Sequence, residues 1–171
     1  MAESNLAPLN PPPSRLPKVG TTIFTVMSAL AAEKNAVNLG QGFPDFDCDP
    51  RIVDAVTHAM RTGHNQYPPM AGVPQLRQAI AAKIAKLYEH TYDWNTEITV
   101  TAGATQGLLT AILCAVHPGD EVIVLEPCYD SYLPAIELAG ATAVPVTLEA
   151  PLFRIPFDKL AAAITPRTRM I

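Results

Sequence analysis

The stretch Ile98–Thr105 combines residue types that could hold an anion. A β-branched run breaks at Gly103 and passes at once into the helical run Gln106–Val116. A helix start leaves backbone N–H groups free, and its dipole favours negative charge. Gly103 allows close backbone approach, and the Thr105 hydroxyl can cap the helix or contact a phosphate. Two interpretations stay open from these residues alone, a phosphate-binding turn and an ordinary strand-to-helix turn with a threonine cap.

A second candidate feature follows the next apolar run. Glu121–Leu125 is typical of a short buried strand and leads into the segment Glu126–Tyr132. The carboxyl ends of neighbouring parallel strands open on one crevice, so Tyr129 could face an anion held at the turn after Gly103. A flat aromatic ring there suits stacking on a planar cofactor. Packing at the start of a helix is the alternative role for Tyr129.

Five segments occur along the chain in a fixed order: Asn38–Phe46, Asn65–Gly72, Val100–Gln106, Pro118–Val124 and Glu126–Tyr132. Together they resemble the class I/II aminotransferases of fold type I, which use pyridoxal 5′-phosphate (PLP). The resemblance covers residues 16–171. Within the family, the region around Gly20–Phe24 and Met27–Leu30 is most similar to the methionine aminotransferase and kynurenine/glutamine transaminase branch.

The resemblance implies transfer of an amino group from an amino acid to a 2-oxo acid, with PLP as the electron sink. The donor classes left open are methionine, aromatic residues, glutamine and kynurenine. The partner implied is a second copy of the chain in a homodimer. The resemblance also implies roles for seven residues: Gly103, Ala104 and Thr105 on the phosphate, Tyr129 on the ring, Tyr67 on the partner subunit's cofactor phosphate, and Gly42 and Phe24 on the substrate.

The predicted fold class is α/β, a three-layer, mostly parallel sheet flanked by helices, as in the large domain of the family. Residues 1–48 are expected to form an extended arm and part of a small domain, and residues 49–171 an incomplete large domain. Helices alternate with strands, which favours parallel crossovers. Strands are predicted at 98–101, 121–125, 142–147 and from 168, and helices at 23–32, from 50, from 74, at 105–116, 130–139 and near 157–163.

The composition agrees with a cytoplasmic enzyme. The chain has 49% hydrophobic residues, a net charge of −4 and no basic cluster, which argues against a nucleic-acid surface. Its three scattered cysteines, Cys48, Cys114 and Cys128, are expected to be reduced thiols. No run is long enough to span a bilayer, and no metal site is expected, because Pro50 stands where a calcium loop beginning at Asp45 would need glycine.

No catalytic residue is assigned within these 171 residues. In the family, the cofactor-binding lysine and the arginine for the substrate carboxylate lie later in the chain. The strand that begins at Thr168 has no closing helix, so we expect an N-terminal portion that is inactive alone. The lysines present lack the family context and are predicted to be surface residues: Lys18, Lys34, Lys83, Lys86 and Lys159.

Three other functions are compatible with parts of the pattern. A carbon–sulfur lyase on the same fold would share the turn at Gly103 and the stacking Tyr129. A non-catalytic module with an aminotransferase-like domain would need a DNA-binding domain in front, for which the Pro-rich start leaves no room. A nicotinamide-dependent oxidoreductase is disfavoured, because the Gly-x-Gly-x-x-Gly motif is absent.

Overall fold

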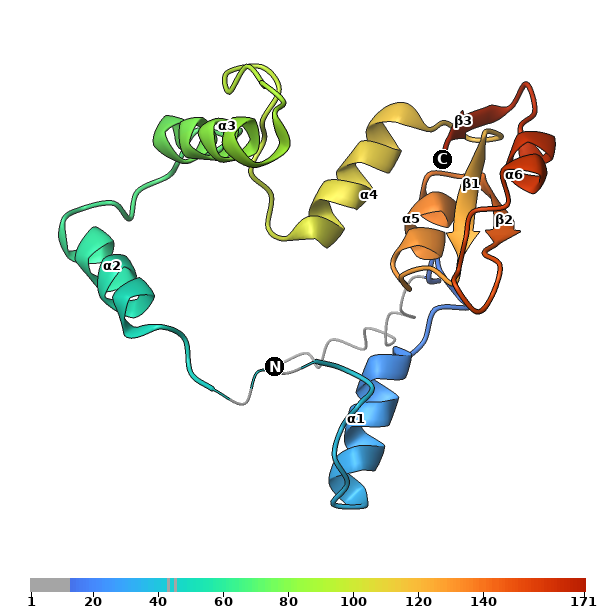
Figure 1. Cartoon of the computed structure of the whole chain (residues 1–171), viewed down its shortest axis with the longest axis horizontal. Helices are drawn as coiled ribbons and strands as arrows, with labels where there is room; N and C mark the ends of the chain where they lie inside the picture. Colours follow the sequence, from blue (N-terminus) through green and yellow to red (C-terminus); the bar gives the residue numbers. More distant parts are fainter. Residues whose placement is uncertain (1–12, 43, 45) are drawn as a thin grey trace, which may run out of the picture. The chain divides into compact units, whose positions relative to one another are not determined.

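A computed structural model describes residues 13–42, 44 and 46–171 (Figure 1). Residues 1–12, Phe43 and Asp45 lie outside the described part, and with them most of the expected N-terminal arm and the first position of the rejected calcium loop. The described chain forms two compact units. One unit joins the chain up to Val26 with Leu108–Ile171, and the other is Met27–Gly107.

The first unit is built on a parallel sheet. Its strands are β1 (Glu121–Glu126), β2 (Thr142–Thr147) and β3 (Thr168–Met170), in the order β2-β1-β3. Glu121 pairs with Thr142 on one side of β1 and with Thr168 on the other. The predicted strands at 121–125, at 142–147 and from 168 are therefore confirmed, as is the α/β class.

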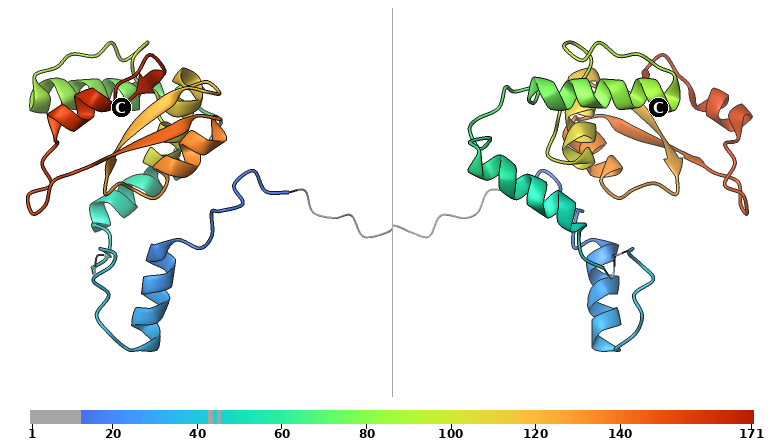
Figure 2. Two further views of the ribbon diagram at one scale, coloured as in Figure 1. Left: turned by 90° about the vertical axis from the view of Figure 1, so that its right-hand side faces the viewer. Right: turned by 60° about the vertical axis from the view of Figure 1, so that its left-hand side comes forward.

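Helices cover both faces of this sheet. The helices α5 (Tyr132–Leu138) and α6 (Phe157–Ala163) lie wholly in this unit. The helix α1 (Ile23–Glu33) begins in it, and α4 (Ala104–Ala115) begins in the other unit and enters this one at Leu108. The two views of Figure 2 place α5 and α6 on opposite faces of the strands. Because β1 lies between two layers of helices, it reads as a continuous apolar run, and Ile123 is only 2% exposed.

The hydrophobic core lies between β1 and the helices α4 and α5. Ile112 of α4 and Ile136 of α5 pack against alternate residues of β1, Val122 and Val124. Alternation along a strand sends every second side chain to the same face, so these two valines meet the helices together. This core fixes the end of β1, and therefore the position of the Glu126–Tyr132 segment.

The second unit contains two further helices, α2 (Pro50–Arg61) and α3 (Pro74–Tyr88). Both begin with proline, which suits the first helical position because its missing N–H has no intrahelical partner there. The Asp49 carboxylate caps α2 by accepting a 2.9 Å hydrogen bond from the Arg51 N–H. The apolar side of α2 is exposed, with Ile52 at 57% and Val56 at 53%.

Two predicted elements need correction. Ile98–Thr101 is not a strand in the structure, and the Val100 N–H donates to the Ala71 carbonyl at 3.0 Å. β-Branched residues favour an extended backbone, but a strand also needs a ladder of hydrogen bonds to another strand, and no strand of the described part pairs with this segment. The helix predicted at 130–139 is shorter than expected, because α5 starts at Tyr132.

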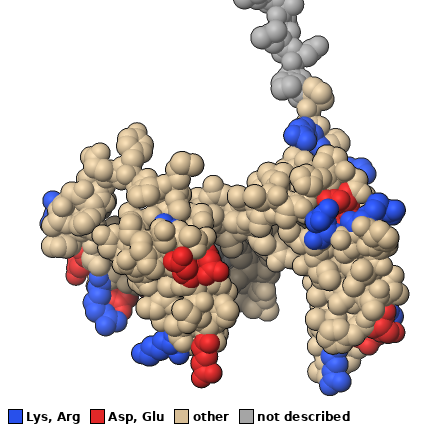
Figure 3. Space-filling model, turned by 90° about the horizontal axis from the view of Figure 1, so that it is seen from above, with Lys and Arg blue, Asp and Glu red and all other residues tan. Residues whose placement is uncertain are grey.

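The surface carries charges of both signs. On the face shown in Figure 3, lysine and arginine atoms are interspersed with aspartate and glutamate and form no single basic patch. Cys48, Cys114 and Cys128 are free thiols, in agreement with the sequence. Within the described residues, no helix combines the length and apolar character needed to cross a membrane.

Candidate functional site

The turn before α4 has the backbone features expected of an anion site. Gly103 has a φ of +84°, in the left-handed region, and nothing lies within 4 Å of the place where a Cβ would stand. α4 begins at Ala104, so the first N–H groups of the helix have no intrahelical acceptor. Gly103, Ala104 and Thr105 are all exposed. At the predicted position the structure therefore has exposed backbone N–H groups, with no side chain in front of Gly103.

Two neighbouring side chains brace this turn. The Thr101 hydroxyl donates to the Gly103 carbonyl at 2.9 Å, and the Gly103 N–H donates to the Thr101 carbonyl at 2.9 Å. The Gln106 side-chain oxygen accepts a hydrogen bond from the Ala102 N–H, in the manner of a capping residue. The Thr105 hydroxyl makes no hydrogen bond within the described residues, so it is free to meet a ligand.

Tyr129 lies in an aromatic cluster within the first unit. Its ring centroid is 6.2 Å from that of Phe24 at an interplanar angle of 37°, and 6.1 Å from that of Tyr132 in an edge-to-face arrangement. These separations are in the range of favourable aromatic pairs. Tyr129 is still 48% exposed. The ring therefore packs before α5, as the alternative interpretation held, and also keeps a free surface on which a planar ligand could stack.

Cys128 precedes Tyr129 in the chain and packs, partly buried, against the hydrophobic core. Burial raises the pKa of the Cys128 thiol above its ordinary value, and the nearby Glu126 carboxylate raises this pKa further. A thiol with a raised pKa is a weak nucleophile at neutral pH. Cys128 is therefore a residue that packs against the hydrophobic core rather than a reactive group.

Two predicted site residues lie apart from any cluster. Tyr67 is fully exposed, in the irregular segment between α2 and α3. Gly42 is exposed, and a Cβ built on it would have nothing within 4 Å. The described residues thus leave Tyr67 and Gly42 open to a ligand or a partner, and their roles stay predictions.

The lysines are surface residues, as predicted. Lys34 pairs with Glu33 at 2.6 Å and Lys159 with Glu149 at 3.2 Å, and both lysine side chains are more than half exposed. Lys18, Lys83 and Lys86 are also exposed. None of the five is a core residue.

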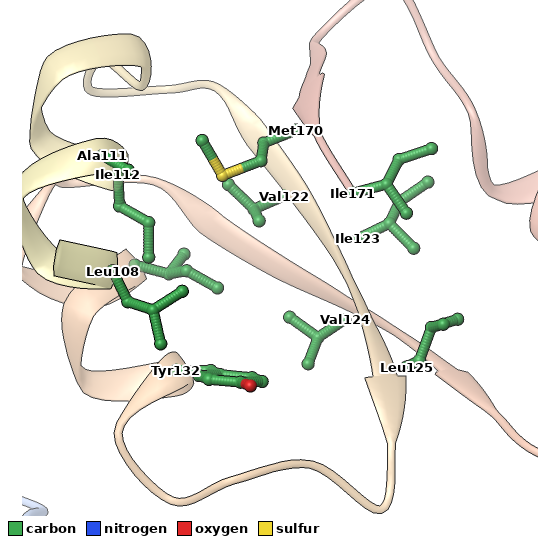
Figure 4. Close-up of a pocket in the computed structure, with 11 residues that line it drawn as sticks. Leu108, Ala111, Ile112, Val122, Ile123, Val124, Leu125, Tyr132, Met170 and Ile171 are labelled. Carbon is green, nitrogen blue, oxygen red and sulfur yellow. The ribbon is translucent and has the colours of Figure 1, made fainter. Parts of the chain in front are cut away.

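An apolar hollow of about 310 Å³ lies beside β1, between α4 and β3 (Figure 4). Its wall includes Leu108, Ile112, Val122, Tyr132 and Met170. None of its lining residues is cationic, and a doubly charged phosphate would be poorly solvated there. The hollow is therefore an opening in the hydrophobic core and not a candidate phosphate site.

The sequence reasoning missed one buried side chain close to the turn. Arg77 of α3 is 7% exposed, and its guanidinium donates to the carbonyl oxygens of Ile98 at 2.8 Å and Asn95 at 2.7 Å. The signal was present in the sequence, because Arg77 lies three and seven residues before Ile80 and Ile84 on the apolar side of α3. A charged residue on an apolar helix face needs a buried partner.

Comparisons with known proteins identify the family. The sequence pattern of the family "Aminotransferase class I and II" matches residues 34–171. The chain is 49% identical over 160 residues to a methionine aminotransferase of Escherichia coli K12, covering 94% of this chain and 42% of the relative. It is 47% identical over 160 residues to a probable N-succinyldiaminopimelate aminotransferase of Mycobacterium tuberculosis, covering 92% of this chain and 40% of the relative.

Solved structures agree with the sequence relatives. An Escherichia coli structure described as having a methionine aminotransferase function is 50% identical, with a TM-score of 0.89 over 95% of this chain and 42% of that one. The aspartate aminotransferase of Rhizobium meliloti is 34% identical, with a TM-score of 0.81. The chain belongs to the class I and II aminotransferase family, and it spans less than half the length of these relatives.

Proposed function

We propose that the complete protein carrying this chain is a PLP-dependent aminotransferase, which moves an amino group from an amino acid to a 2-oxo acid. The observation that carries this proposal is the family match over residues 34–171, which contain both the turn at Gly103 and the Tyr129 segment. Fold alone would not define the reaction, since one fold hosts several chemistries. Here the family match is supported by two separate features, a turn and an exposed aromatic ring, each of which suits one part of the cofactor.

The turn before α4 fits the phosphate of PLP. That phosphate needs several N–H donors and a hydroxyl, and the free N–H groups of Ala104 and Thr105 offer the donors at the positive end of the helix dipole. Gly103, with its φ of +84°, keeps the backbone accessible. The Thr105 hydroxyl, which has no hydrogen-bond partner among the residues described, would add a charge-assisted hydrogen bond. These residues would hold and orient the phosphate.

The aromatic cluster fits the ring of the cofactor. The exposed side of Tyr129 would stack on the pyridine ring, and Phe24, whose ring lies 6.2 Å away, would support Tyr129 and line the substrate pocket. When bound, PLP supplies an electron sink for the bonds at the amino-acid α-carbon. The chain's own residues orient that ring and exclude water from one of its sides.

The remaining site residues would act at the substrate and at a subunit interface. The Gly42 backbone would approach the substrate carboxylate, and Tyr67 would reach the cofactor phosphate of the partner in a homodimer. The full exposure of Tyr67 supports such a reach. We further propose that residues 1–48 belong to an arm and a small domain and residues 49–171 to the large domain, and that the protein is cytoplasmic, in keeping with its three free thiols.

Methionine is the first amino donor to test. The chain is 49% identical to a methionine aminotransferase and 47% identical to a probable N-succinyldiaminopimelate aminotransferase, while aspartate aminotransferases are 34–38% identical. Aromatic residues, glutamine and kynurenine are the other donors to test. A kynurenine–oxoglutarate transaminase of Rattus norvegicus is 36% identical over 137 residues.

The proposal is tested on the complete protein. Purified protein should contain one PLP per chain, measured after release by alkali, and should convert methionine plus a 2-oxo acid into the matching oxo acid and amino acid. Release of pyruvate or ammonia without amino-group transfer would establish the lyase alternative instead. Protein that neither retains added PLP nor transfers an amino group would overturn the proposal.

A further inference from the structure

We propose that Arg77, Gly72 and Val100 form a joint that positions the Gly103–Thr105 turn and, at the same time, the base of the segment carrying Tyr67. The inference rests on the proposed function, because it assigns these residues to the positioning of phosphate contacts. All the contacts that support it lie within the unit Met27–Gly107. None of the three residues is proposed to touch the cofactor, so each is a positioning residue.

Arg77 is the buried centre of this joint. Its guanidinium donates to the Ile98 and Asn95 carbonyls and lies 5.6 Å from the centroid of the Trp94 ring. Within the described residues Arg77 forms no salt bridge. Its direct partners are two carbonyl dipoles and an aromatic face. The Asn95 N–H, which donates to the Asp93 carboxylate, lowers the pKa of that carboxyl, and the charge of Arg77 lowers it further. A buried charge is costly unless it is well hydrogen-bonded. The planar guanidinium bonds two separate carbonyls and an aromatic face at once, which a lysine ammonium cannot reproduce.

Val100 connects this buried arginine to the turn before α3. Its N–H donates to the Ala71 carbonyl at 3.0 Å. A Cβ on Gly72 would stand only 2.6 Å from Val100 Cγ2 and 2.8 Å from Val100 Cβ, and Gly72 has a φ of +100°. Both the close approach and the left-handed backbone therefore require glycine. The Ala71–Gly72 turn and the segment at Val100 therefore pack so closely that a methyl group at position 72 would clash with the Val100 side chain.

The joint acts in two directions along the chain. From Val100 it is three residues to Gly103, and the Thr101 hydroxyl bonds the Gly103 carbonyl and lies 3.3 Å from where a Cβ on Gly107 would stand. In the other direction, Gly72 lies five residues after Tyr67. A shift of this joint would therefore displace the turn proposed for the chain's own phosphate and the tyrosine proposed for the partner's.

The first experiment replaces the guanidinium in the complete protein. Arg77→Lys should speed the loss of PLP on dialysis about tenfold, since bonds to a charged group are lost and carbonyls are left unpaired. The control is Arg61→Lys on α2, an exposed arginine, which should change PLP loss less than about twofold. Amide hydrogen exchange in the apoprotein should rise over residues 100–105 in Arg77→Lys and stay unchanged in Arg61→Lys.

The second experiment tests the close approach with matched glycines. Gly72→Ala and Gly63→Ala both place a side chain at a positive φ, +100° and +92°, but only Gly72 has a neighbour within 4 Å. Gly72→Ala should therefore speed both PLP loss and exchange at residues 100–105, and Gly63→Ala should do neither. Adding Val100→Gly to Gly72→Ala should relieve the clash. The double variant should therefore lose PLP more slowly than the sum of the two single-variant effects predicts.

The two measurements, PLP loss and amide exchange in the apoprotein, separate this inference from the proposed function. Wild-type protein that binds no PLP would overturn the proposed function. The exchange measurement on the apoprotein would still decide whether the joint orders residues 100–105. Folded Arg77→Lys and Gly72→Ala proteins with wild-type exchange over that segment would overturn the joint. The joint would also be overturned if Gly63→Ala and Gly72→Ala gave equal PLP loss and equal amide exchange.

Discussion

Thr101 and Gly103 are tied to each other by two hydrogen bonds. The Thr101 hydroxyl donates to the Gly103 carbonyl, and the Gly103 N–H donates to the Thr101 carbonyl, both at 2.9 Å. The pair closes a tight loop around Ala102 and holds Gly103 at its φ of +84°. The direction in which the first N–H groups of α4 point is therefore set by a side chain that lies before the turn.

Removal of the Thr101 hydroxyl should loosen this turn. We expect Thr101→Val to lower the free energy of unfolding by about 1 kcal/mol, the net value of one intramolecular hydrogen bond, and to speed PLP loss in the complete protein. Urea unfolding and dialysis measure the two effects. Thr110→Val in α4, which is exposed and forms no side-chain hydrogen bond in the described part, is the control. Equal behaviour of the two variants would contradict the bracing role of Thr101.

Thr105 should matter more for cofactor retention than the Tyr129 hydroxyl does. Thr105→Val removes the hydroxyl that we propose bonds the charged phosphate, and such a hydrogen bond is worth about 1.5–3 kcal/mol. Tyr129→Phe keeps the ring and its contacts with Phe24 and Tyr132. Dialysis of the two complete proteins, followed by PLP quantification, compares them directly. Faster loss from Tyr129→Phe would mean that the two roles have been assigned wrongly.

Much of the first unit could be predicted from local sequence alone. β2 has the predicted bounds, Thr142–Thr147, and α6 occupies Phe157–Ala163 as expected. Each of these short elements is preceded by a residue that marks its start. Gly140, at a φ of +76°, ends the helix before β2, and Pro156 precedes α6. Local chemistry decides such boundaries.

Elements that depend on distant partners were harder to predict. Ile98–Thr101 has the residues of a strand, but its hydrogen bonds go to Ala71 and to Arg77. The role of Arg77 depends on carbonyls 18 and 21 residues further along the chain, which no local pattern specifies. The turn at Gly103 could be found because glycine and a helix start are local signals.

Two glycines near the ends of α4 and α5 should differ in their tolerance of alanine. A Cβ on Gly140 would stand 3.2 Å from Pro118 Cβ at a φ of +76°, whereas Gly119, at +89°, has open space. Both substitutions carry the left-handed backbone cost of about 1–2 kcal/mol. Gly140→Ala should lower the free energy of unfolding more than Gly119→Ala does, because the Pro118 ring must also move. Urea unfolding of the complete variants tests this, and an equal or larger loss for Gly119→Ala would contradict it.

The junction of β1 and β3 should be sensitive to acid. The Thr165 hydroxyl, which donates to Glu121 at 2.6 Å, and then the Arg167 guanidinium lower the pKa of the Glu121 carboxyl below its ordinary 4.5. A carboxyl whose pKa is lowered on folding contributes stability above its unfolded pKa and loses that contribution as the pH falls through the folded pKa. The Glu121 contribution should therefore be complete at neutral pH and should decline below about pH 4.5.

Glu121→Gln separates this contribution from the general effect of acid. The amide cannot ionise, so the variant should be less stable than wild type at pH 7, and this difference should shrink as the pH falls from 4.5 towards 3. Glu137→Gln, on the exposed side of α5, is the matched control and should follow the wild-type curve. The measurement is the urea midpoint of the complete protein at each pH. A stability difference between Glu121→Gln and wild type that stays constant from pH 7 to pH 3 would show that the Glu121 charge does not hold β1 to β3, because a purely steric effect of the amide would not titrate.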